Sequence, residues 1–374
     1  MNKIWLLFIL LIITTLNIKA VNILVDNTDQ QEVIVAVEEE LNVKKLILGH
    51  LADSYEWNIW SQGSNHISLS LPIIIYSKNS GWHLFLSSKF NHGNSSYNGF
   101  YIATDGKYNG KIVEVDELGN EVRPFDLSLT KNAASLIINS LILILLILGI
   151  AKVMKRDPLK SHKGFTGLME MFILTIEDEV IKATVGKDYK RYSPYLLTVF
   201  FFIFINNLMG LVPFFPGGAN VTGNIAVTLV LAISTFLVIN LTGSKAYYKE
   251  IFWPDVPTWL KVPFPLMPII EVVGMFTKPF ALMIRLFANI MAGHAIVLGL
   301  TCLVFVTVSL GPTINSSMTV LSAIFTVFIN FVELLVAFIQ AYVFTLLSAV
   351  FIGLARADHS KGNKEKIEPV ENKV

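Results

Sequence analysis

Two long apolar stretches, residues 264–310 and 318–354, limit what this chain can fold into more than any other feature of its sequence. Each is longer than the roughly 20 residues that an α-helix needs to cross a membrane, so helices of this length must tilt strongly or break. Of the 374 residues, 53% are hydrophobic and only 15% are charged, which excludes an ordinary soluble protein. We therefore expect an integral membrane protein.

Charge and cysteine content exclude several further classes. The formal net charge is +1, so no basic surface points to a nucleic-acid partner. The single cysteine, Cys302, lies in an apolar stretch and supports neither a disulfide framework nor a cysteine metal site. Four histidines in the N-terminal third lack metal-ligand spacing and are expected to be ordinary surface residues: His50, His66, His83 and His92. No cofactor is therefore predicted.

The N-terminal region predicts an exported domain. Residues 1–20 have a basic start, about 13 apolar residues and a small residue, Ala20, at a possible cleavage point, as in a secretory signal peptide. A retained anchor is the alternative, because Ile18 is not small. Residues 21–130 alternate polar and apolar positions between Asn/Gly turns, which predicts a small β-rich extracytoplasmic domain.

The first membrane span and its orientation follow from residues 132–154, which are long and apolar enough to cross once. A basic loop comes next, with Lys152, Lys155, Arg156, Lys160 and Lys163. The positive-inside rule places this loop in the cytoplasm and therefore residues 21–130 outside.

A surface helix is predicted next, in residues 164–186. Apolar residues recur there at roughly helical spacing, opposite acidic ones; they are Leu168, Phe172, Ile176 and Ile181. This pattern is typical of a helix that lies on the membrane surface, here the cytoplasmic one.

Two further spans are expected at residues 193–212 and 224–242, joined by a short outer loop. The chain then crosses twice more, with the uncharged sequence GPTINSS as the outer turn, and ends in a basic cytoplasmic tail, residues 356–374. We predict an all-α polytopic membrane domain, residues 131–355. It has five transmembrane helices, the last two long and tilted, and one surface helix on the cytoplasmic side.

The last two helices contain ionisable residues that packing alone does not explain. Arg285 lies in the middle of an apolar stretch, where a charge costs about 2.5–3.5 kcal/mol on insertion scales. Such residues face a bundle interior, a water-filled cavity or a partner; snorkelling to a helix end is the structural alternative. The same two helices also contain Glu271, His294, Glu333 and Gln340.

Helical rise converts these positions into depths. On the penultimate helix His294 lies about 13 Å outward of Arg285, and Glu271 about 21 Å inward. The last helix runs back inward, and Glu333 precedes Gln340 by two turns. If Gln340 is level with Arg285, Glu333 comes to a depth similar to that of His294. The arrangement suggests two proton paths that reach a central cation from opposite sides.

Helical periodicity also separates the directions of these side chains. His294 is about 180° from Arg285 around the helix axis, whereas Asn289 shares the arginine face. Arg285 and His294 are therefore expected to contact different neighbours.

Three motifs of the membrane domain resemble those of a known protein family. The sequences MIRLFANIMAGH, ELLVAFIQAYVFTLL and NNLMGLVPFF, taken together, resemble subunit a of the F-type ATP synthase over about residues 130–355. The resemblance implies a stator without a catalytic site, which delivers protons to a ring of c subunits. It also implies contact with the b subunits and the rest of the synthase in a bacterial inner membrane.

The resemblance also implies roles for single residues. Arg285 would face the c-ring with help from Gln340. His294 and Glu333 would line the outer half-channel, and Glu271 the inner one. Asn289 joins this set as the residue that shares the arginine face.

The sequence departs from the family pattern in places. The acid and histidine are exchanged relative to the best-known bacterial branch, Ala281 stands where some relatives have serine, and residues 1–130 lie outside the common pattern. No G-x-x-x-x-G-K-[ST] motif occurs, so nucleotide binding is left to partner subunits.

Other interpretations remain open. A secondary transporter would usually contain inverted repeats, which we do not detect. An intramembrane hydrolase would need a nucleophile beside a base. Asn206 and Asn207 are expected to form polar contacts between helices, with channel lining as the alternative. Whether the coupling ion is a proton or sodium is also open.

Overall fold

A computed structural model describes residues 52–356, except 63–64, 105, 117–118, 157–161, 213–214 and 254–265, together with positions 43, 47 and 49. The elements below all belong to one unit, Ile47–Val374. The predicted signal peptide, residues 21–51 of the predicted outer domain apart from those three positions, and residues 357–374 of the predicted C-terminal tail lie outside the described residues.

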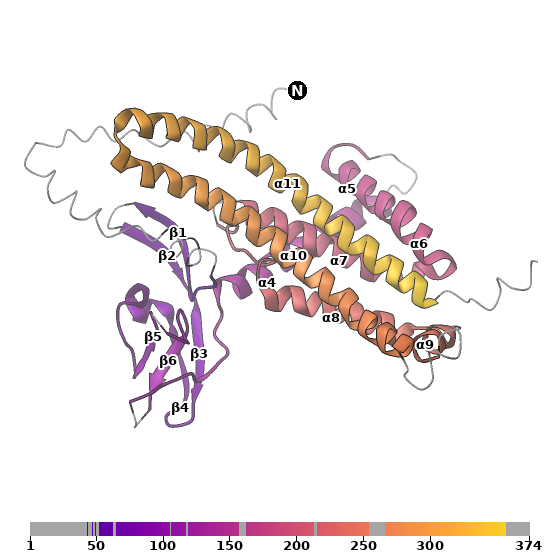
Figure 1. The fold of residues 1–374 in the computed structure, drawn as a ribbon, viewed down its shortest axis with the longest axis horizontal. Coiled ribbons are helices and arrows are strands. Elements are labelled where there is room, and N and C mark those ends of the chain that lie inside the picture. The colour runs from indigo at the N-terminus through magenta and orange to yellow at the C-terminus, as the bar shows by residue number, and fades with distance from the viewer. Residues whose placement is uncertain are drawn as a thin grey trace, which may run out of the picture. The chain divides into compact units, whose positions relative to one another are not determined.

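Residues 52–130, called the β domain below, form three small antiparallel sheets (Figure 1). The first pairs β1 (Glu56–Gln62) with β2 (Asn65–Ser70). The second has the order β4–β3–β8, with β3 at Pro72–Ser77, β4 at Gly81–Leu86 and β8 at Phe125–Asp126. The third has the order β5–β6–β7, with β5 at Phe100–Ile102, β6 at Ile112–Val115 and β7 at Glu121–Val122. The predicted β-rich region is confirmed.

Alternation along β3 explains how the β domain forms a core. Ile73 and Ile75 are fully buried, and they pack with Phe90, Phe100 and Ile112. Phe90 belongs to the short 3-10 helix Ser87–Gly93, which follows β4 directly. Successive side chains of a strand point to opposite faces, so the other face of β3 does not contribute to this core.

The rest of the described chain is mostly helical (Figure 1). The long helices are α4 (Lys131–Arg156), α7 (Tyr189–Leu211), α8 (Ile225–Thr242), α10 (Leu266–Val306) and α11 (Pro312–Arg356). The shorter ones are α5 (Gly164–Thr175), the π-helix Ile176–Lys182, α6 (Ala183–Val185), the 3-10 turn Gly186–Asp188, α9 (Lys245–Phe252) and the 3-10 turn Thr307–Leu310.

In the part of the chain that the structure describes, five helical segments are long and apolar enough to cross a membrane, as predicted. They are Lys131–Arg156, Gly164–Leu211, Ile225–Thr242, Leu266–Leu310 and Pro312–Arg356. At 1.5 Å per residue α10 and α11 are roughly 60 Å long, about twice the thickness of the hydrocarbon core. They lie side by side and are continuous, α10 even through Pro279.

The turn between α10 and α11 is shorter than predicted. Residues 311–317 were expected to form it, but α11 already begins at Pro312. The chain reverses at Gly311, which has a φ of +101°. Glycine is suited to this position because residues with a side chain rarely adopt this conformation.

The segment predicted to be a surface helix is helical, as α5, the π-helix and α6, and it packs on α7 and α11. Its buried residues include Ile176 and Ile181, and Phe172 contacts the rings of Phe204 and Phe338. Leu168, the first residue of the predicted apolar pattern, is 44% exposed and does not belong to this core.

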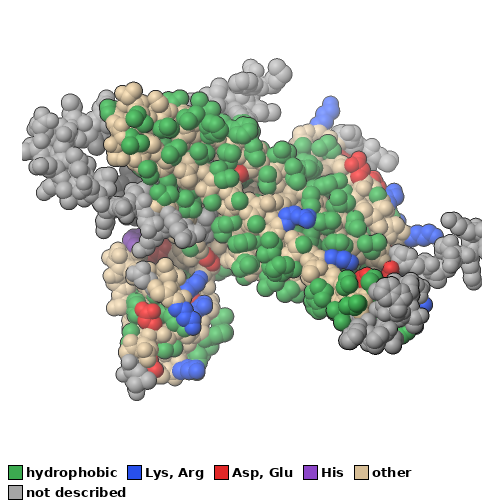
Figure 2. Space-filling model, viewed as in Figure 1, with side chains coloured by type: hydrophobic (Ala, Val, Ile, Leu, Met, Phe, Trp, Pro, Cys, Tyr) green, Lys and Arg blue, Asp and Glu red, His purple; other side chains and the backbone are tan. Residues whose placement is uncertain are grey.

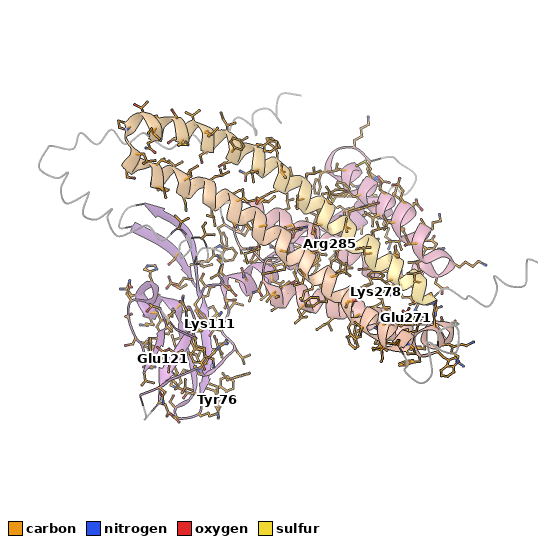
Figure 3. All side chains as sticks on the ribbon, in the orientation of Figure 1. Tyr76, Lys111, Glu121, Glu271, Lys278 and Arg285 are labelled. Atoms are coloured by element: carbon orange, nitrogen blue, oxygen red, sulfur yellow. The ribbon has the colours of Figure 1, made fainter. Side chains whose placement is uncertain are left out.

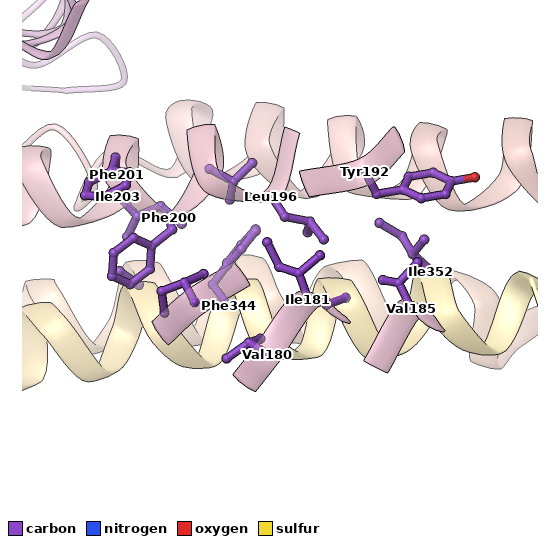
Figure 4. Close-up of a cluster of buried hydrophobic side chains, with 14 of the residues drawn as sticks. Val180, Ile181, Val185, Tyr192, Leu196, Phe200, Phe201, Ile203, Phe344 and Ile352 are labelled. Carbon is purple, nitrogen blue, oxygen red and sulfur yellow. The ribbon is translucent and has the colours of Figure 1, made fainter. Parts of the chain in front are cut away.

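The main hydrophobic core lies where the π-helix, α7 and α11 meet (Figure 4). Leu196, Phe200 and Ile203 of α7 are fully buried, and Phe344 and Ile352 of α11 are at most 1% exposed. This core fixes α11 against α7. Gln340, one turn before Phe344, is therefore held at a defined position.

Candidate functional site

Arg285 lies on the unpacked face of α10. Leu282, Met283 and Leu286 are buried, whereas Ile284, Arg285 and Asn289 are exposed. Figure 2 shows that the long helices present a largely hydrophobic surface, and Figure 3 shows Arg285, Lys278 and Glu271 along α10. Within the described ranges Arg285 has no ion-pair partner. The charged side chain of Arg285 therefore lies on the exposed face of α10, on a largely hydrophobic surface.

Asn289 connects the arginine face of α10 to α11. Its Nδ2 donates to Oε1 of Gln340 over 2.8 Å, and Gln340 is only 3% exposed. Asn289 is one turn closer than Arg285 to the C-terminal end of α10, so Gln340 lies about one turn, or roughly 6 Å, from the level assumed from the sequence. The Nε2 of Gln340 is buried and has no hydrogen-bond partner among the described residues. The two N–H groups of the Gln340 side-chain amide thus have no acceptor among the described residues, although they lie beside the face of α10 that contains Arg285.

Glu333 of α11 reaches the backbone of α10 beside His294. A Cβ atom placed on Gly293 would lie 2.4 Å from Oε1 of Glu333. The missing side chain of Gly293 therefore makes room for the carboxylate, one residue before His294. Oε1 of Glu333 is buried without a described hydrogen-bond partner. The structure brings Glu333 to the level of His294, as expected, although the assumption behind that expectation, that Gln340 is level with Arg285, is wrong by about one turn.

His294 points away from the arginine face. Its Nε2 lies 3.7 Å from the position that a Cβ atom of Gly210 would occupy at the end of α7. Arg285, by contrast, lies on the exposed side of α10. The two residues therefore have different neighbours, as helical periodicity predicts.

Glu271 lies near the other end of α10, where it is partly buried close to α9. The pKa of Tyr247 is raised above its ordinary value, mainly by burial and, to a lesser extent, by electrostatic interaction with Tyr248 and with Glu271. Glu271 is therefore near Tyr247. Tyr247 also lines a small cavity of about 20 Å³ together with Asn240 and Lys278. Its volume suffices for about one water molecule.

This cavity is lined by polar residues that were not predicted from the sequence to belong to the site. The Oδ1 of Asn240 is buried without a hydrogen-bond partner in the described part of the chain. The ammonium of Lys278 lies 5.6 Å from the centre of the Phe351 ring. Asn240, Tyr247 and Lys278 come from three different helices, so no spacing in the sequence could have grouped them.

Buried amides join the N-terminal half of α4 to the C-terminal part of α7. Asn139 donates to Oδ1 of Asn206 over 3.0 Å, and Thr222 donates to Oδ1 of Asn207 over 2.7 Å. Nδ2 of Asn207 donates to the carbonyl of Ala337 over 3.3 Å. The prediction that Asn206 and Asn207 form polar contacts between helices is confirmed. Their partners Asn139 and Thr222 were not predicted.

No group of three or more His, Cys, Asp or Glu residues is placed to hold a metal ion in the part of the chain that the structure describes. Cys302 is buried and free. The site thus consists of the exposed cation Arg285, the neighbouring Asn289–Gln340 amide pair, His294 and Glu333 at one level, and Glu271 near the N-terminal end of α10.

Comparison with known proteins yields two family matches. The family model described as ATP synthase A chain matches residues 134–353, which is more than half of the chain. A second model, described as a domain of unknown function (DUF8433), matches residues 46–133. The boundary between the two matches, at residues 133 and 134, lies in the first turn of α4.

Curated relatives support the first match. ATP synthase subunit a of Chloroherpeton thalassium is 42% identical over 251 residues, which cover 65% of this chain and 71% of the relative. The subunit of Chlorobium phaeobacteroides is 40% identical over 250 residues, 64% of this chain and 69% of the relative. That of Myxococcus xanthus is 41% identical over 242 residues, 62% of this chain and 74% of the relative.

The length of the family match, the level of identity and the five membrane-spanning helices agree with one another. They imply a multi-pass membrane protein that associates with the rest of an ATP synthase. The chain therefore belongs to the family of subunit a of the F-type ATP synthase, a proton-translocating component of the membrane sector that has no catalytic site of its own.

Proposed function

We propose that this chain is a stator in which Arg285 faces the carboxylates of a rotating c-ring, between two proton half-channels. The observation that carries the proposal is the position of Arg285 on the unpacked face of α10, beside the Asn289–Gln340 pair. A permanent cation on an apolar, membrane-embedded surface needs a partner. A carboxylate on a neighbouring ring would supply one.

The chemistry of arginine suits this role. A guanidinium keeps its proton at any physiological pH, so it attracts a deprotonated carboxylate without passing on the proton itself. Protons would therefore have to arrive and leave at other groups. Arg285 would separate the two half-channels electrostatically.

The two half-channels are assigned to different levels of α10. His294 and Glu333 lie at one level on the outer side of Arg285 and would exchange protons with water there. Glu271 lies inward, close to the small cavity beside Tyr247, and would belong to the inner half-channel. Asn289 and Gln340 would orient the carboxylate that approaches Arg285.

The proposal includes an orientation and partners. The β domain would be periplasmic and the C-terminus cytoplasmic in a bacterial inner membrane, with the c-ring and the b subunits as partners. The basic residues after α4 support this orientation. A cysteine at Asn98 should react with an impermeant thiol reagent from outside, and one at Ser360 only from the cytoplasmic side. The reverse labelling would contradict both the orientation and the half-channel assignments.

The substitution Arg285→Lys tests the central role. A desolvated lysine can lose its proton, so the substitution should abolish coupled ATP synthesis in vesicles that contain the assembled complex. Passive proton leak is measured in the same vesicles. Arg156→Lys, an exposed substitution at the end of α4, is the control and should leave synthesis unchanged. Near-normal synthesis in Arg285→Lys would show that the arginine is only structural.

A further inference from the structure

The β4–β3–β8 sheet of the β domain has one face that is apolar and exposed. Cross-strand partners lie on the same face of a sheet, and Tyr76 pairs with both Trp82 and Phe125. Leu84, opposite Ile74, is 75% exposed, and Trp82 and Phe125 are 62% and 60% exposed. We call this surface the apolar sheet face; its exposed members are Tyr76, Trp82, Leu84, Leu86, Phe125 and Leu127.

The β domain does not need this surface for its own core. The opposite face of β3 supplies Ile73 and Ile75, which pack with Phe90, Phe100 and Ile112. A contiguous apolar patch that is exposed outside the core typically marks contact with another protein or with a membrane. The position of the sheet along the chain distinguishes these two possibilities.

The sheet is attached to the first membrane helix almost without a linker. The amides of Leu127 and Leu129 donate to the carbonyls of Ile74 and Pro72, so the pairing with β3 continues beyond β8. Only one residue separates Leu129 from Lys131, where α4 begins. The sheet is therefore held within a few residues of the point at which the chain enters the membrane.

The start of α4 is also fastened to the other end of the β domain. The amide of Lys131 donates to the carbonyl of Ser54 over 2.8 Å, and that of Asn132 donates to Oδ1 of Asp53 over 3.0 Å. Ala134 of α4 packs in one hydrophobic cluster with Trp57 and Leu71. These contacts restrict movement of the β domain relative to the start of α4.

The residues of the apolar sheet face match the chemistry of a lipid interface. Tyr and Trp are enriched where headgroups meet acyl chains, because their rings are apolar with one polar atom. Tyr76 and Trp82 are paired on this face. Exposed cations stand two residues from Tyr76 and from Phe125, namely Lys78 and Arg123. Cations near the surface attract anionic headgroups.

We propose that the apolar sheet face lies in the lipid interface of the leaflet at which α4 enters the membrane. The strands would run along the bilayer surface, so that both ends of the face, Leu86 and Trp82, contact lipid. The β domain would thereby hold the outer end of α4 in place. This role does not depend on the proposed half-channels.

Spin labels test this placement in the assembled complex. The background is Cys302→Ser, and the complex is reconstituted in vesicles of phosphatidylethanolamine and phosphatidylglycerol. A nitroxide is attached at Leu84→Cys and, as a control, at Ser96→Cys, an exposed position beside Tyr97 on the side of the core. Collisions with oxygen, which concentrates in lipid, are compared with collisions with a water-soluble nickel chelate.

The label at position 84 should favour oxygen over the nickel chelate several-fold more than the label at position 96. Equal access of the nickel chelate to both positions would show that the face is in water and would overturn the proposal. Low access of both reagents to position 84 would show that a protein covers the face, and would overturn it as well.

A second variant displaces the face without touching the core. Trp82→Glu combined with Leu84→Glu changes two exposed side chains, so the domain should still fold. A nitroxide at Leu86→Cys should become more accessible to the nickel chelate in this variant than in the chain that retains Trp82 and Leu84. An unchanged ratio of oxygen to nickel collisions would argue against lipid contact.

Discussion

The carboxylate of Glu333 on α11 occupies the space that a side chain on Gly293 of α10 would fill. A Cβ atom there would lie 2.4 Å from Oε1 and 3.1 Å from the carboxyl carbon. The absence of that side chain allows the two helices to approach closely enough to place the acid beside His294. A residue with no ionisable group thus controls where an ionisable one lies.

Gly293→Ala should displace Glu333 and slow proton-driven ATP synthesis several-fold without preventing assembly. The nearest atoms belong to the end of a flexible side chain, so the carboxylate moves and the helices stay packed. Gly299→Ala is the matched control, because no atom lies within 4 Å of its Cβ position. Both changes favour the helix by up to about 1 kcal/mol. Equal rates in the two variants would contradict a role for the Gly293–Glu333 contact.

His294→Ala and Glu333→Gln should each slow proton delivery, because water can bridge a missing relay only in part. If both residues serve one pathway, the double variant loses less than the product of the two single losses. The measurement is the initial rate of ATP synthesis at a fixed proton gradient. Fully multiplicative losses would instead indicate separate roles.

Asn139 and Asn206 should be coupled energetically. Asn139→Leu leaves the buried Oδ1 of Asn206 without its donor from α4. The coupling measured by a double-mutant cycle with Asn206→Leu should be about 0.6 kcal/mol, as for other hydrogen bonds between membrane helices. Thermal inactivation of the detergent-solubilised complex reports the stabilities. Additive losses would show that the Asn139–Asn206 hydrogen bond contributes nothing measurable.

The β domain should lose stability at alkaline pH through Tyr55. Its hydroxyl donates to Oδ2 of Asp126 over 2.5 Å, and burial, followed by this hydrogen bond and the charge of Asp126, raises the pKa of Tyr55 well above its usual value. Because the pKa is higher in the folded than in the unfolded state, the stabilisation is complete below about pH 10. It is lost as the pH rises from there towards the folded-state pKa.

Thermal unfolding, followed by the infrared band of the β-sheet, checks this expectation between about pH 8 and about pH 12. Tyr55→Phe should lower the unfolding temperature at pH 8 and flatten its decline above about pH 10. Tyr101→Phe is the control, since the hydroxyl of Tyr101 donates to Glu121 at the surface, where solvent screens the interaction. The same alkaline slope in Tyr55→Phe and in the unaltered chain would refute the assignment.

The sequence by itself determined the positions of residues along each helix. Helical rise is constant, so the order of Glu271, Arg285 and His294 in depth follows from counting residues. Helical periodicity likewise separated the face of Arg285 from that of His294, and the structure agrees. The five spans were also predictable, since a membrane requires long apolar segments with internally satisfied backbone hydrogen bonds.

Only the tertiary structure decided which helices meet and at what register. Gln340 lies level with Asn289 and not with Arg285, Glu333 rests against Gly293, and Asn139 pairs with Asn206. Each of these contacts joins residues on different helices. Their register depends on how neighbouring helices pack, and helical spacing within one segment contains no information about its neighbour.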